Sequence, residues 1–212
     1  MKCYTGKEKL NARLNTIITP YRELFHQSIP TNEQYWTLAG SILNEKGKIN
    51  KDSEINQLLS ENLISKSQFF GVDQNKEIIQ SNSNNMKEVN WIHNTLKDAI
   101  LNAIQNNSFN PAIINIDHVS MPKQACKDFK DIFKILTPIK KKNLLVILNT
   151  LTTNPYNNES CDPNSIVDIL NSDQFFSHYL KTGNWNTLNK HYNYSGSGNT
   201  KKSKLTTLIF WR

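Results

Sequence analysis

Apolar residues along the chain fall into two kinds of segment, helical stripes and short continuous runs. In the stripes, apolar residues recur three and four positions apart, which indicates amphipathic helices. The helices predicted in this way lie at about residues 8–25, 52–62, 75–80, 96–104 and 125–136. The short runs are rich in β-branched, aromatic and aliphatic residues and indicate strands. The predicted strands are residues 35–40, 69–73, 89–92, 111–117 and 144–149. Because apolar strands alternate with helices, the pattern predicts a mostly parallel sheet covered on both faces.

The C-terminal part of the chain follows a different pattern. Residues 166–170 and 175–180 read as short helices. The segments 191–194 and 205–211 then read as two strands joined by a loose hairpin over Ser195–Asn199. The sequence therefore predicts an antiparallel pair at the edge of the parallel sheet.

A chain of 212 residues with 37% apolar residues favours one sizeable domain with a proper core. We predict a single domain over residues 1–212. Residues 1–30 form its N-terminal covering helix region, kinked or split at Pro20, and residues 31–212 form its core. The three cysteines are odd in number and far apart, which fits neither a disulfide framework nor a zinc site. No signal peptide or membrane-spanning run is evident, so a cytoplasmic protein without a membrane partner is expected.

The formal net charge of +7 favours an anionic partner such as nucleic acid. The excess lies in short clusters, Lys140–Lys142 and Lys201–Lys204, rather than in one stripe. Solvated lysines that keep the protein soluble explain these clusters equally well. Nucleic acid is therefore a candidate partner on charge alone.

Polar residues follow three of the predicted strands: Gly40 and Ser41, then Asp73, then Asp117 and His118. The carboxyl ends of parallel strands share one edge, where ligands of open α/β sheets bind. The two oxygens of the Asp73 carboxylate match the two hydroxyls of a ribose. The alternative is that Asp73 caps the helix that begins near residue 75. His118, beside Asp117, is a candidate proton acceptor near neutral pH.

The order of segments resembles that of the class I, Rossmann-like S-adenosylmethionine-dependent methyltransferases. The matching pieces are YWTLAG, SEINQLLSENLI, FFGVDQNKEII, VNWIHNTLKDAI, AIINIDHVS, LLVILNTL and the final TTLIFWR. The resemblance covers roughly residues 34–212 and implies a three-layer α/β/α sandwich, with S-adenosylmethionine and S-adenosylhomocysteine as ligands.

The resemblance also implies roles for particular residues. Asp73 would hold the cofactor ribose, and Gly40 and Ser41 would lie at its methionine end. Asp117 would face the methyl donor and the acceptor. One of three residues after the third strand would lie beside the adenine: Asn94, Thr95 or Asp98. The resemblance gives no methyl acceptor, and nucleic acid is the class that the charge favours.

The first loop departs from the family pattern, which has several glycines after an acidic residue. Only Gly40 stands near the end of the first predicted strand. A second hypothesis is therefore an inactive relative that binds nucleic acid or a protein through its lysines and its C-terminal hairpin. A third hypothesis is metal-dependent chemistry, in which Asp73 and Asp117 share Mg²⁺. No further acidic ligand is evident and the five histidines lack metal-site spacing, so no metal site is predicted.

Overall fold

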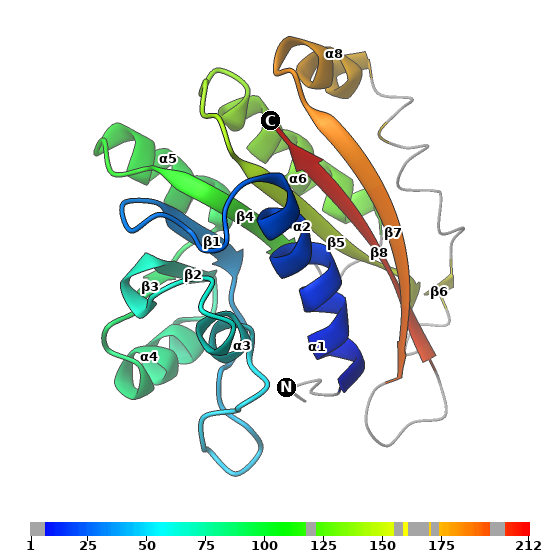
Figure 1. Ribbon diagram of the computed structural model, residues 1–212. Helices are drawn as coiled ribbons and strands as arrows, with labels where there is room; N and C mark the ends of the chain where they lie inside the picture. The colour runs from blue at the N-terminus through cyan, green and yellow to red at the C-terminus, as the bar shows by residue number, and fades with distance from the viewer. Residues whose placement is uncertain (1–6, 118–121, 155–158, 161–169, 171–173, 196–201) are drawn as a thin grey trace. The chain divides into compact units, whose positions relative to one another are not determined.

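The computed structural model describes residues 7–117, 122–154, 159–160, 170, 174–195 and 202–212. The chain divides into two compact units, Met1–Asn115 and Ile116–Arg212, and each is described by itself (Figure 1).

The first unit is built on four parallel strands. In spatial order they are β3 (Asn90–His93), β2 (Phe69–Asp73), β1 (Gln34–Leu38) and β4 (Pro111–Asp117). The neighbouring strands therefore end at one common edge of the sheet. This arrangement confirms the parallel sheet that the alternating pattern predicts.

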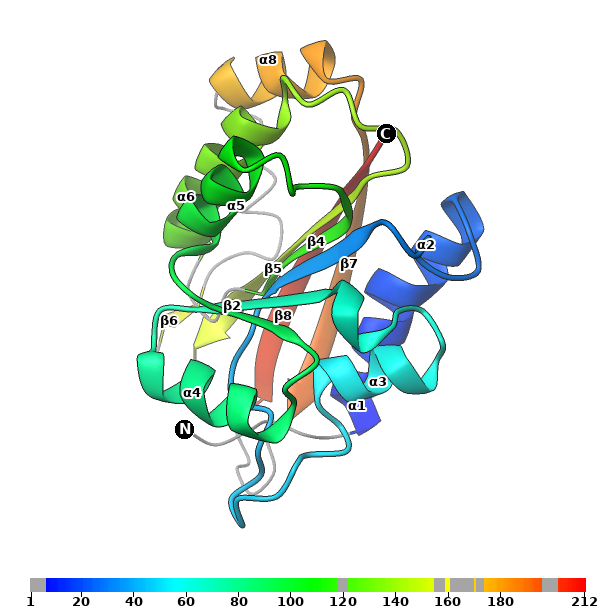
Figure 2. The ribbon, with the colours of Figure 1, turned by 90° about the vertical axis from the view of Figure 1, so that its left-hand side faces the viewer.

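Helices connect these strands and cover both faces of the sheet. They are α3 (Glu54–Ser60), the 3₁₀ turn η2 (Lys66–Gln68), α4 (Lys76–Asn85) and α5 (Leu96–Gln105). Neighbouring residues of a strand point to opposite faces. Tyr35 contacts Glu54 of α3, whereas Trp36 packs against Phe109, which follows α5. Accordingly, Figure 2 shows α3 and α5 on opposite sides of the strands.

The N-terminal segment forms a broken helix that packs on α3. It comprises α1 (Lys7–Arg13), the π-helical segment η1 (Leu14–Ile18) and α2 (Thr19–Leu24). Pro20 lies in the first turn of α2, where its missing N–H group is not needed. The break predicted at Pro20 is thus a π-helical segment just before it. Gln57 of α3 donates to the Leu10 carbonyl at 2.8 Å, which joins α3 to α1.

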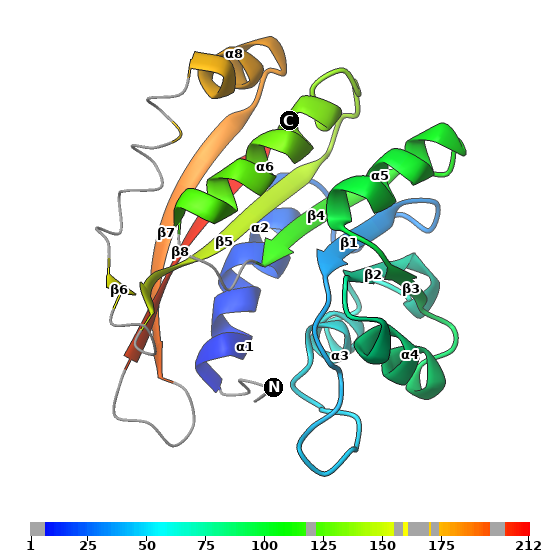
Figure 3. The same cartoon turned by 180° about the vertical axis from the view of Figure 1, so that it is seen from behind.

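The second unit is built on antiparallel strands. β8 (Lys202–Trp211) lies between β5 (Leu145–Asn154) and β7 (Asn186–Ser195), and the short β6 (Glu159–Ser160) pairs with β5. Helix α6 (Pro122–Leu136) covers one face of this sheet (Figure 3). Its Phe129 and Phe133 pack against Phe210 of β8, each with ring centroids 5.1 Å apart. Helix α8 (Gln174–Thr182) precedes β7.

The predicted fold class, α/β with a mostly parallel sheet and an antiparallel C-terminal pair, is confirmed. The hairpin strands are longer than the predicted segments 191–194 and 205–211. Tyr194, the last residue of the predicted segment 191–194, belongs to β7. Of the predicted helix at 166–170, only Leu170 lies among the described residues, where it is helical and buried.

Candidate functional site

Asp73 ends β2 at the carboxyl edge of the first unit's sheet. It pairs with His93, the last residue of β3, in the parallel register. One of its carboxylate oxygens, Oδ1, accepts a hydrogen bond from the Asn75 N–H at 2.7 Å. The other, Oδ2, has no hydrogen-bond partner among the described residues, and the side chain is half-buried. A carboxylate held through one oxygen in this way can offer the other to a hydroxyl group of a ligand.

Asn75, and not Asp73, caps helix α4. Asn75 occupies the N-cap of α4, and its side chain accepts from the N–H groups of Glu77 and Ile78. Asp73 instead forms the turn that precedes the cap. The helix therefore does not use the Asp73 carboxylate as its cap.

The loop after β1, residues 39–53, begins beside Asp73. The Ala39 N–H donates to the Val72 carbonyl, so Gly40 lies just past the last bond between β1 and β2. Gly40 is exposed, and its N–H has no hydrogen-bond partner among the described residues. Ser41 is half-buried, and its hydroxyl accepts from the Leu43 N–H at 3.1 Å. The structure thus brings the two predicted loop residues to the same edge as Asp73.

Asn82 fixes this loop, although nothing in the sequence singled it out. It is fully buried on α4, where its Nδ2 donates to the Gly40 carbonyl and its Oδ1 accepts from the Ile42 N–H, both at 3.1 Å. One amide side chain therefore satisfies a donor and an acceptor of the loop backbone. The only available signal is that Asn82 lies three residues after Ile79 on the buried face of the helix.

Of the three candidate residues after β3, Asn94 is the one hydrogen-bonded to Asp73. Its N–H donates to the Asp73 carbonyl at 3.1 Å. Thr95 and Asp98 form a capping interaction for α5, with the Thr95 hydroxyl accepting from the Asp98 N–H and donating to its carboxylate. These two side chains serve the start of the helix, so Asn94 is the best placed of the three toward a ligand at Asp73.

The predicted reaction residues fall in the second unit. Asp117 ends β4 and is half-buried, with an interaction partner of its own. His118 lies outside the described residues. Their roles stay predictions.

A buried polar network, which no sequence motif predicts, lies on the α3 side of the first unit's sheet. Glu54 is its centre: Oε1 accepts from the Tyr35 hydroxyl at 2.8 Å and Oε2 accepts from the Asn115 amide at 3.1 Å. Arg13 of α1 lies 3.7 Å from Oε2 and donates to the Asp52 carbonyl. Burial, and then the Glu54 charge, raise the pKa of Tyr35 well above its usual value. The network joins α1, α3, β1 and β4.

The ring of Trp91 packs against the backbone of Gly71, two residues before Asp73. A Cβ atom at Gly71 would lie 2.5 Å from Cζ3 of Trp91 and 3.0 Å from Cβ of Ala39. The Trp91 ring cannot easily move, because its Nε1 donates to the Met86 carbonyl at 2.9 Å and its centroid lies 5.7 Å from that of the Phe69 ring. Gly71→Ala is therefore expected to lower the free energy of unfolding by about 1–3 kcal/mol, measured in urea.

Gly40→Ala is the matched control for this prediction. No atom lies within 4 Å of a Cβ built at Gly40, and its φ is not left-handed. The free energy of unfolding of Gly40→Ala should stay within about 0.5 kcal/mol of the wild-type value. Equal destabilisation by the two variants would contradict the role given to Trp91.

The described residues include neither a cluster of metal ligands nor a membrane-spanning helix. No group of three or more His, Cys, Asp or Glu side chains is placed to hold a metal ion. No described helix has the length and apolar character to cross a bilayer.

No protein-family model matches the sequence, and no curated protein matches it. Among solved structures, the chain is similar to the precorrin-6y C5,15-methyltransferase from Geobacter metallireducens GS-15. The identity is 11%, the match covers 88% of this chain and 82% of the other, and the TM-score is 0.49. Because a match at this level does not identify a fold, the fold class above rests on the strand pairing in each unit.

Proposed function

We propose that the carboxyl edge of the first unit binds S-adenosylmethionine and that the protein transfers its methyl group to an acceptor. The observation that carries the proposal is Asp73. It ends the second of four parallel strands, has one oxygen fixed by a backbone N–H and has the other without a partner among the described residues. Ligands of open α/β sheets bind at this edge, and a carboxylate there accepts the hydroxyls of a ribose.

The residues around Asp73 fit a nucleoside ligand by the chemistry of their donors and acceptors. Asp73 offers acceptor capacity, and the exposed Gly40 N–H offers a donor. Asn94 is tied to Asp73 through the backbone and carries a half-buried amide. Among these, Asp73 would hold the ribose, Gly40 and Ser41 the methionine end, and Asn94 the base.

The residues of this edge would act by positioning. The bound cofactor supplies a methyl group that its sulfonium already activates for transfer. Asp73 would then fix the nucleoside end, and the loop held by Asn82 would fix the other end. Holding donor and acceptor in line supplies much of the rate enhancement in such transfers, so a strong general base is not required. Asp117 is proposed to face the acceptor.

Titration calorimetry with S-adenosylmethionine and S-adenosylhomocysteine tests the proposal. Wild type should bind, and Asp73→Ala should weaken binding about 10- to 100-fold, since hydrogen bonds to a charged group contribute about 1.5–3 kcal/mol. Asp73→Asn should weaken binding as well. Its amide oxygen can still accept from the Asn75 N–H, but its NH₂ group cannot accept from a hydroxyl.

Glu77→Ala is the matched control, because it removes an exposed carboxylate from the first turn of α4. This variant should bind like wild type. The proposal is wrong if wild type binds neither compound, or if Asp73→Asn binds as tightly as wild type.

A further inference from the structure

We propose that the second unit binds the phosphate backbone of a nucleic acid through a basic surface at the amino end of β5. The surface consists of Lys140, Lys141 and Lys142, in the loop between α6 and β5, together with Lys181 at the end of α8. Lys140, Lys142 and Lys181 are exposed, and Lys141 is half-buried. We call these four residues the lysine surface.

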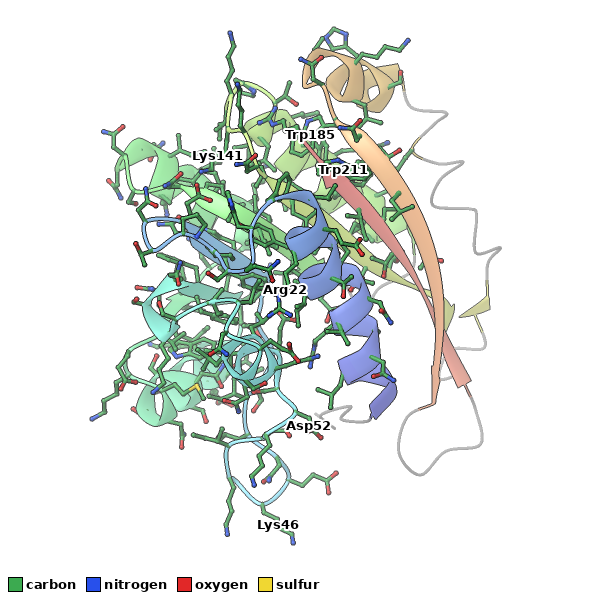
Figure 4. All side chains as sticks on the ribbon, in the orientation of Figure 1. Arg22, Lys46, Asp52, Lys141, Trp185 and Trp211 are labelled. Atoms are coloured by element: carbon green, nitrogen blue, oxygen red, sulfur yellow. The ribbon has the colours of Figure 1, made fainter. Side chains whose placement is uncertain are left out.

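The Arg212 side chain connects the two segments that carry the lysine surface. Its guanidinium lies over the Trp185 ring, 4.3 Å from the centroid. The same group donates to the carbonyls of Leu136 and Ile139, on the loop side, and of Gly183, on the α8 side. The loop that carries Lys140–Lys142 and the turn after Lys181 are therefore fixed to one side chain. Figure 4 shows Lys141, Trp185 and Trp211 at the same end of the unit.

Further contacts order the loop itself. Leu144 and Arg212 exchange two backbone hydrogen bonds, of 3.2 and 3.3 Å, where the loop enters β5. Asn143 adopts a left-handed conformation with φ of 58°, and Ile139 donates to the Leu136 carbonyl at 3.0 Å. A preorganised loop loses little conformational entropy on binding, which favours a real site over a run of freely moving lysines.

The charge of the whole protein is concentrated in this unit. Residues 116–212 contain 13 Lys and Arg against 7 Asp and Glu, a net charge of +6, whereas residues 1–115 contain 12 against 11, a net charge of +1. No acidic residue occurs between Thr137 and Asn143. Lysines that only keep a protein soluble need not gather in one unit. A site that binds a polyanion requires such a concentration of positive charge.

The chemistry of the lysine surface favours nucleic acid over a membrane. A membrane-surface site combines basic residues with apolar side chains that enter the lipid. The large apolar residues that are exposed among those described are Leu24, Ile49 and Leu188, and none belongs to either segment of the lysine surface. Lysine side chains without an apolar anchor suit evenly spaced phosphates, which they contact without reading the sequence.

The lysine surface lies far from the carboxyl end of β5. This strand has ten residues, so its two ends are about 30 Å apart. The other basic cluster is at that far end, because Lys204 of β8 pairs with Thr153 of β5. The lysine surface and the other basic cluster therefore lie at opposite ends of the second unit, and the proposed lysine surface does not depend on the proposed methyl transfer.

Binding of a fluorescein-labelled 20-base-pair DNA duplex, measured by anisotropy over a range of salt concentrations, tests the proposal. Lys140→Gln combined with Lys142→Gln should weaken binding about 10- to 100-fold near 0.1 M salt. The slope of log K against log salt should become shallower by about 2, because each phosphate contact contributes about 0.9. Both side chains are exposed, so thermal unfolding should not change.

The control is Lys46→Gln combined with Lys48→Gln, which makes the same change of charge on the loop after β1, where Figure 4 labels Lys46. It should retain the wild-type salt slope and bind within about threefold of wild type. The proposal is overturned if wild type does not bind the duplex, or if the two double variants lose affinity equally. Binding of wild type to phosphatidylserine vesicles but not to the duplex would also overturn it. Failure to bind S-adenosylmethionine would leave it intact.

Discussion

Glu54→Ala is expected to lower the free energy of unfolding by about 3–5 kcal/mol, because breaking a buried ion pair leaves the other charge without compensation. The side chains of Glu54 and Arg13 are only 13% and 12% exposed. Removing the carboxylate also takes the acceptor from the Tyr35 hydroxyl and the Asn115 amide. The Arg13 Nε atom has no hydrogen-bond partner among the described residues, and the hydrogen bond from Nη1 to the Asp52 carbonyl brings no negative charge to replace that of Glu54.

Urea unfolding at pH 7 measures this effect, and Glu61→Ala provides the comparison. Glu61 also belongs to the α3 region and pairs with an arginine of the N-terminal segment, Arg22, at 3.3 Å. The Arg22 and Glu61 side chains are 28% and 38% exposed, and pairs in such positions contribute about 0–1 kcal/mol. Similar losses in the two variants would show that the Glu54 network does not behave as a buried one.

Glu54→Gln separates charge from hydrogen bonding in the network. The amide oxygen of glutamine can still accept from one donor, while the attraction to Arg13 is lost. An intermediate loss is therefore expected. A loss as small as that of Glu61→Ala would mean that the hydrogen bonds, rather than the charge pair, carry the stabilisation.

The bounds of the parallel strands were predicted best where turn-forming residues or proline lie next to an apolar run. The predicted bounds of β2 and β4, at 69–73 and 111–117, match the structure. The first is followed by a turn built by Asp73 and Asn75, and the second begins at Pro111. The hairpin strands β7 and β8 were predicted too short. Their ends pair with each other but contain mainly polar residues, which give no strand pattern in the sequence.

The candidate site was predictable only in its strand-end residues. Asp73, Gly40 and Asn94 follow from strand order alone, since parallel strands end at one edge. Thr95 and Asp98 also follow a strand, but they serve the start of α5. Only the structure could separate these two groups, because a cap and a ligand contact use the same residue types.

The buried polar residues were not predictable, because their burial depends on tertiary contacts. Asn82 is one of many asparagines in the chain, and only the path of the loop after β1 gives its amide two partners. Glu54 reads as an ordinary acidic residue in the first turn of a helix. Ser53 holds the N-cap position of α3, yet its hydroxyl makes no capping hydrogen bond.

Stability is expected to fall steeply above about pH 10, because two buried tyrosines resist ionisation in the folded protein. The pKa values of Tyr35 and Tyr21 are both raised, mainly by burial, with additional contributions from the charges of Glu54 and Glu33, respectively. Both side chains are fully buried. Above the unfolded-state pKa of about 10, the unfolded chain has lost these protons while the folded chain keeps them. The unfolded state then binds fewer protons, so the free energy of unfolding decreases as pH rises.

The expected slope is up to about 1.4 kcal/mol per pH unit for each tyrosine, or about 2.7 kcal/mol per pH unit for the two together. Below about pH 10 both tyrosines are protonated in both states, so neither contributes to the pH dependence. Tyr21→Phe is the sharper variant, since the Tyr21 hydroxyl is buried without a hydrogen-bond partner among the described residues. Its removal should cost little at pH 7 and should halve the alkaline slope, measured by urea unfolding between pH 9 and pH 11. An alkaline slope that is unchanged in Tyr21→Phe would contradict this assignment and would place the titrating groups elsewhere.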